Sequence, residues 1–116
     1  MVCNKELINV LLNDILLSPQ LSFAIARLLL ERVFVSWNRP ENMVGENHIR
    51  RFLVVDFYQI LCKKKEEYLE AIHDYSKNAD DHLSLQNRIK KINEISLLLQ
   101  KKEYHDEIIY FMNILI

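Results

Sequence analysis

Apolar residues recur along this chain at spacings of three and four, the period of an amphipathic α-helix. The first helix is predicted over residues 4–17, with Asn4 as its N-cap and one broad apolar stripe. Ser18 followed by Pro19 is typical of a helix start, because proline at the first helical position loses no hydrogen bond. A second helix is therefore expected from Pro19 to about Trp37.

The second half of the chain shows the same period after one clear break. Residues 38–47 contain a proline, the only glycine and several asparagines, which predicts a loop. A long helix is then expected over residues 47–76, followed by a polar turn at 77–82 and a further helix. The final stretch either continues that helix or turns near residues 102–105 and starts a fifth one, since no glycine or proline decides between the two.

These segments predict an all-α fold, a compact bundle of four to five helices. Its main parts are a central, mostly apolar second helix and a long antiparallel C-terminal hairpin, formed by residues 47–76 and 81–116. The chain fits one domain, residues 1–116, and a domain of this length buries roughly two-thirds of the surface that its unfolded form exposes. The alternative is that the chain is a fragment of a larger helical protein.

The segment 21–37 holds only three charged residues, which raises the question of a membrane helix. A membrane span needs roughly twenty apolar residues, and this shorter segment has its charges inside rather than at its ends. Arg27 and Glu31 share one narrow helical stripe, and Arg32 lies outside it. A transmembrane segment is therefore not predicted, and the second helix is expected at the centre of a soluble bundle.

Charge and cysteine content narrow the expected partner and compartment. The chain carries 15 basic and 16 acidic residues, for a formal net charge of −1, so nucleic acid is not the expected partner. A helical nucleic-acid-binding protein stays an alternative, using Arg50, Arg51 and the lysines of the third and fourth helices. The two cysteines form neither a disulfide framework nor a metal-binding spacing, which predicts an intracellular location in the cytoplasm or nucleus.

Candidate catalytic and metal-binding patterns are incomplete. Glu70 and His73 have the E-x-x-H spacing of di-iron helical bundles, but the second copy that such a site needs is missing. The scarcity of glycine argues against a phosphate loop or an oxyanion loop, and Cys62 is best explained as a core residue. We therefore predict no enzyme activity, no catalytic, cofactor-binding or metal-binding residue, and no small-molecule substrate. A helical enzyme or metal protein is the remaining alternative.

The most informative feature is a surplus of apolar residues, which exceeds what a bundle of this size is expected to bury. A protein partner or a second copy of the chain would cover the remainder, unless the same residues fill the protein's own core. The predicted contact residues are Val33, Phe34, Trp37, Phe111, Met112, Leu115 and Ile116. The predicted function is a non-enzymatic protein–protein interaction module, an oligomerising scaffold, adaptor or regulator that presents a hydrophobic helical surface.

Overall fold

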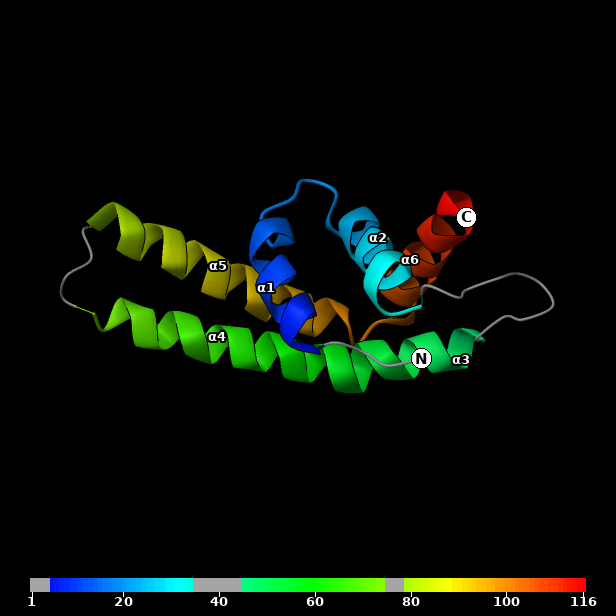
Figure 1. Cartoon of the computed structure of the whole chain (residues 1–116), viewed down its shortest axis with the longest axis horizontal. Coiled ribbons are helices and arrows are strands. Elements are labelled where there is room, and N and C mark those ends of the chain that lie inside the picture. Colours follow the sequence, from blue (N-terminus) through cyan, green and yellow to red (C-terminus); the bar gives the residue numbers. More distant parts are fainter. Residues whose placement is uncertain (1–4, 35–44, 75–78) are drawn as a thin grey trace.

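The computed structural model describes residues 5–34, 45–74 and 79–116, and every regular element in these ranges is helical (Figure 1). The elements are, in chain order, α1 (Lys5–Ile15), α2 (Leu21–Arg32), α3 (Glu46–Arg51), the π-helix η1 (Phe52–Phe57), α4 (Tyr58–Ile72), α5 (Ala79–Leu98) and α6 (Lys102–Leu115). Since α3, η1 and α4 follow one another without a break, they form one long helix. The described ranges thus contain five separate helices, which confirms the predicted all-α bundle.

The long helix and α5 lie antiparallel as a hairpin along the base of the molecule in the view of Figure 1. Helix α1 crosses α4, and α2 contacts both α1 and α6. Half of the residues of α2 are buried. The side chains that form the core between these helices include Ile8, Leu12, Leu16, Ile25, Leu29, Ile49, Leu53, Phe57, Leu61, Ile95, Leu99 and Ile108.

Two local features shape the long helix. It begins directly after Gly45, whose φ of 99° lies in the region that glycine adopts without strain. Further along, η1 brings Phe52 and Phe57 onto one face, because residues five apart align in a π-helix. Both side chains are buried, with ring centroids 6.4 Å apart. In a continuous α-helix the two side chains would point about 140° apart and could not both face the core.

Helix α2 is shorter than predicted at both ends. It begins at Leu21 rather than at Pro19, because residues 16–20 carry the turn from α1 into α2. It stops at Arg32, well before Trp37, which itself lies outside the described residues. None of the described helices has the combined length and hydropathy of a bilayer-crossing segment.

The early end of α2 has a packing cause. The backbone N–H groups of Val33 and Phe34 both donate to the carbonyl of Leu29, at 2.9 and 2.7 Å, and close the last turn. The Phe34 ring then packs edge-on against Phe52 of the long helix, with centroids 5.7 Å apart. Contact with a distant part of the chain thus overrides the apolar pattern that predicted a longer helix.

The chain turns between α5 and α6, which decides the open question at the C-terminal end in favour of a fifth helix. The turn occupies residues 99–101, just before the predicted position at 102–105. The ring Nε2 of buried His105 donates to the carbonyl of Leu99 at 2.6 Å. This bond gives a hydrogen-bond donor to a backbone carbonyl that has no helical partner at the end of α5. The second arm of the hairpin therefore ends at Leu98 instead of extending to residue 116, and α6 packs against α2.

Candidate functional site

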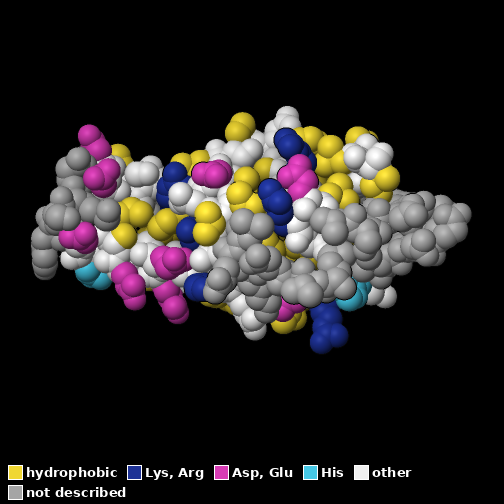
Figure 2. Space-filling model, in the orientation of Figure 1, with side chains coloured by type: hydrophobic (Ala, Val, Ile, Leu, Met, Phe, Trp, Pro, Cys, Tyr) yellow, Lys and Arg dark blue, Asp and Glu magenta, His cyan; other side chains and the backbone are white. Residues whose placement is uncertain are grey.

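Exposed apolar side chains concentrate on the outer face of α6 near its C-terminal end. Tyr110, Ile114 and Ile116 are 60%, 55% and 60% exposed, and Leu115 is 37% exposed. Half-buried Phe111 joins this face to α2. In Figure 2, hydrophobic side chains are visible over the end of the molecule where Figure 1 places α2 and α6.

Two residues of α2 extend this apolar face across the helix pair. Phe23 packs edge-on against Phe111, with ring centroids 5.4 Å apart, and the Phe111 ring lies 5.7 Å from that of Tyr110. Leu30 and Leu115 line a shared hollow of about 130 Å³. We call this surface the α2–α6 strip, and it consists of Phe23, Leu30, Tyr110, Phe111, Ile114, Leu115 and Ile116.

A pair of opposite charges borders the α2–α6 strip. The guanidinium of Arg27 donates to the carboxylate of Glu31, one turn further along α2, at 3.1 Å. The two side chains are 58% and 53% exposed, and both line the hollow at Leu30 and Leu115. Since the two charges cancel, this pair adds no net charge to the border of the strip.

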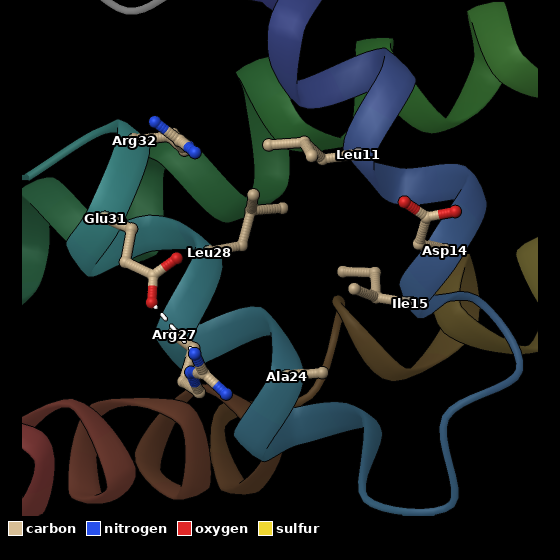
Figure 3. Close-up of a pocket in the computed structure, with 8 residues that line it drawn as sticks. All are labelled: Leu11, Asp14, Ile15, Ala24, Arg27, Leu28, Glu31 and Arg32. Atoms are coloured by element: carbon tan, nitrogen blue, oxygen red, sulfur yellow. Dashed lines mark hydrogen bonds and ion pairs between the residues drawn. The ribbon is translucent and has the colours of Figure 1, made fainter.

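On its other side, the Arg27–Glu31 pair lines a cleft of about 240 Å³ between α1 and α2 (Figure 3). Asp14 lies on the α1 wall and Arg32 on the α2 wall, and the charges of the four polar side chains sum to zero. Within the described ranges, no hydrogen bond or ion pair holds Arg32. The apolar lining of the cleft comes from Leu11, Ile15, Ala24 and Leu28. The cleft therefore has no preference for an ion of either sign.

Three of the predicted contact residues are core residues of the folded chain. Val33, Phe34 and Met112 are only 3%, 4% and 0% exposed, in place of the exposed positions expected from the sequence. The first two are buried because α2 ends early and the chain folds onto Phe52. Met112 lies on the face of α6 that meets the core. These three side chains therefore fill the protein's own core, which is the alternative to a partner contact.

The remaining predicted contact residues lie in or near the α2–α6 strip where the structure describes them. Leu115 and Ile116 are exposed, and Phe111 is half-buried against Phe23. Trp37 lies outside the described residues. The structure therefore brings Phe111, Leu115 and Ile116 together on one surface, and their contact with a partner stays a prediction.

Sequence reasoning does not identify four members of the α2–α6 strip: Phe23, Leu30, Tyr110 and Ile114. The helical period contains the signal for the last two, since it places Tyr110 and Ile114 opposite buried Ile108 and Met112. Which of these two faces meets the core depends on where the chain turns into α6. That turn is not marked by glycine or proline.

A set of polar contacts fixes α1 across the hairpin. The Nδ2 group of Asn9 donates to the carboxylate of Glu67 at 2.9 Å, and the Tyr68 hydroxyl donates to Oδ1 of Asn13 at 2.5 Å. The guanidinium of Arg88 on α5 donates to the backbone carbonyl of Asn13 at 2.5 Å. Burial raises the pKa of the Tyr68 hydroxyl, and the hydrogen bond with Arg88 partly offsets this effect. The contacts join three helices and serve the packing of the bundle.

Among the residues considered for nucleic-acid or metal binding, Arg50 lies on α3, and Glu70 and His73 lie at the far end of the long helix. Arg50 donates to Asp106 of α6 and lies 3.8 Å from Glu46, and its hydrogen bond lowers the pKa of the Asp106 carboxyl. This arginine therefore helps to hold α3 against α6. Glu70 and His73 are both exposed, and among the described side chains no three His, Cys, Asp or Glu residues gather as a metal site requires.

No known protein family, curated protein or solved structure matches the chain. The surface and packing described above are therefore the basis for inferring its function.

Proposed function

We propose that this protein is a non-enzymatic protein–protein interaction module, a scaffold, adaptor or regulator, whose α2–α6 strip receives a helix of a partner or a second copy of the chain. The supporting observation is the continuity of the strip. Tyr110 and Ile114 are more than half exposed, and they adjoin Phe111 and Leu115 on the same helix. Single exposed apolar residues are common on folded proteins, whereas a contiguous set is typical of an interaction surface.

The strip has the features that a docked amphipathic helix needs. Such a helix places apolar side chains in a groove at spacings of three, four and seven residues. Phe111 and Leu115 on α6 and Phe23 and Leu30 on α2 provide apolar edges on two adjacent helices. The hollow at Leu30 and Leu115 is open to an apolar side chain of the partner. Removing apolar surface from water contributes about 25 cal/mol per Å² to a complex, and the entropy lost on association opposes this contribution.

The polar contacts favour this function over nucleic-acid binding. A nucleic-acid-binding surface depends on basic side chains that are free to neutralise phosphates. Arg50 is bonded to Asp106, and Arg88 is bonded to Asn13, so both arginines contribute to the fold. In the apolar strip, by contrast, Tyr110, Ile114 and Ile116 keep more than half of their side chains exposed in the described bundle.

An intracellular location, in the cytoplasm or nucleus, forms part of the proposal. Cys62 is a free, half-buried thiol, which is typical of a protein in a reducing compartment. The expected partner is therefore an intracellular protein or a second copy of the chain.

Photo-crosslinking in the cells that produce the protein tests the proposal. The photoreactive amino acid p-benzoylphenylalanine replaces Tyr110 in one protein and Leu97 in a control, because Leu97 is 71% exposed on α5 but lies outside the strip. We expect a crosslinked protein at position 110 and none at position 97. Leu115→Asp should lower the yield at position 110. Equal yields at the two positions, or no product at position 110, would contradict the proposal.

A further inference from the structure

The α2–α6 strip and the ion pair beside it indicate the kind of partner. We infer that the partner is a second copy of this chain, docked about a twofold axis so that Arg27 of each copy faces Glu31 of the other. The inference rests on the proposed interaction function and adds both the identity of the partner and the register of the contact.

The charges satisfy the condition that a twofold contact imposes. Such a contact must be complementary to itself, because the same surface enters it from both sides. Arg27 and Glu31 carry opposite charges, lie one turn apart on the same face of α2, and are both more than half exposed. When two α2 helices lie antiparallel about an axis midway between these residues, each Arg27 meets a Glu31 of the other copy. The four charges then alternate in sign around the axis.

The same axis joins the apolar surfaces of the two copies. Leu30 lies between Arg27 and Glu31 along α2, so the axis passes close to it. A twofold axis perpendicular to the antiparallel α2 helices keeps the two α6 helices on one side of the contact. The Leu115 side chains, which share a hollow with Leu30, therefore approach one another. The Leu30 and Leu115 ends of the two strips therefore cover one another, while the Phe23 and Tyr110 ends lie on opposite sides of the axis.

The charge balance favours a second copy over a strongly charged partner. The charges of Arg27 and Glu31 cancel, and those of Asp14 and Arg32 in the adjoining cleft cancel as well. A strongly basic or acidic protein would gain no net attraction from these four side chains. The chain as a whole has a formal net charge of −1, so two copies meet without a large repulsion.

Charge reversal gives a test in which two weakened variants rescue each other. Arg27→Glu and Glu31→Arg are prepared separately and studied by sedimentation equilibrium beside the wild-type chain. We expect a wild-type dimer, and a dissociation constant at least about tenfold higher for each variant alone, because like charges then face each other across the axis. An equimolar mixture of the two variants should restore the dimer, since every facing pair is again opposite in sign.

Matched controls separate this effect from a general effect of charge. Lys90→Glu and Glu70→Arg reverse exposed charges on the α4–α5 hairpin, and they should leave the dimer unchanged. Circular dichroism should show the same helix content for all variants, because the substituted side chains are exposed. A monomeric wild-type chain, single variants that dimerise as tightly as the wild type, or a mixture that stays monomeric would each overturn the inference.

Crosslinking at position 110 distinguishes failure of this inference from failure of the proposed function. A monomeric chain that crosslinks a different protein there would refute the second copy and leave the interaction function standing. A monomeric chain that crosslinks nothing at this position would refute both.

Discussion

The two ends of the molecule are each built from a pair of helices, and they differ in what they expose. At one end α2 packs against α6, and the exposed surface is the apolar α2–α6 strip. At the other end lies the hairpin tip, which we define as residues 69–72 of α4 and 79–85 of α5. Exposed carboxylates, including Glu70 and Asp80, are frequent there, and Figure 2 shows Asp and Glu side chains gathered at this end.

Leucines are exposed to a similar degree at both ends, but their surroundings differ. Leu69 and Leu83 at the hairpin tip are 41% and 57% exposed, which matches the range found in the strip. They lie among charged side chains, whereas Leu115 lies beside Phe111 and Leu30. The comparison shows that the exposed fraction of one leucine does not identify an interaction surface. Continuity of apolar side chains across two helices does.

The largest loss of stability is expected at a buried side chain of α6, and it should exceed the loss at an exposed side chain of the hairpin tip. Met112 is fully buried, so Met112→Ala should lower the free energy of unfolding by about 2–5 kcal/mol. Leu83→Ala at the tip should lower it by less than about 0.5 kcal/mol, since that side chain is 57% exposed. Urea unfolding followed by circular dichroism measures both. Equal losses would show that Met112 does not belong to the core.

A smaller effect is expected on association, at two positions of matched exposure. Ile114 in the strip and Leu83 at the tip are 55% and 57% exposed. Ile114→Asp should weaken association by about 1.4 kcal/mol or more, roughly tenfold in the dissociation constant, because it places a carboxylate in an apolar contact. Leu83→Asp should leave association unchanged. Sedimentation equilibrium compares the two, and an effect of similar size at position 83 would remove the distinction between the two ends.

The parts of the fold that follow from local pattern are predictable from the sequence. In α1 the apolar stripe points to a buried face, and Ile8, Leu12 and Leu16 on that stripe are fully buried. The helical class and the paired arrangement of the long helix and α5 follow from the same period. These features depend on residues that are neighbours along the chain, so the sequence pattern contains them.

The candidate site depends on contacts between distant residues, and the sequence pattern does not contain those. Met112 and Ile114 are both apolar and two positions apart, yet one is buried and the other is 55% exposed, because α6 turns back and packs on α2. The end of α2 likewise depends on Phe34 meeting Phe52. Local spacing cannot show which apolar face meets a distant helix, so the strip is recognisable only in the folded chain.

Smaller effects on stability than at Met112 are expected at two buried tyrosines, Tyr104 on α6 and Tyr68 on α4. In the part of the chain that the structure describes, the buried Tyr104 hydroxyl on α6 has no hydrogen-bond partner, whereas the Tyr68 hydroxyl on the hairpin donates to Asn13. Tyr104→Phe should therefore raise the free energy of unfolding by about 1 kcal/mol, and Tyr68→Phe should lower it by about the same amount. Urea unfolding at neutral pH measures both changes.

The pH dependence of Tyr104→Phe tests the burial of that hydroxyl directly. Burial, assisted by the carboxylate of Glu107, raises the pKa of Tyr104 to about 12, while a tyrosine in the unfolded chain ionises near pH 10. The raised pKa means that stability linked to Tyr104 is fully present below about pH 10 and is lost as the pH rises toward about 12. Urea unfolding across this range should therefore show a shallower decline for Tyr104→Phe than for the wild type. Parallel declines would show that the Tyr104 hydroxyl ionises as readily in the folded chain as in the unfolded one. The hydroxyl would then be exposed to water and not buried between the helices of the α2–α6 end.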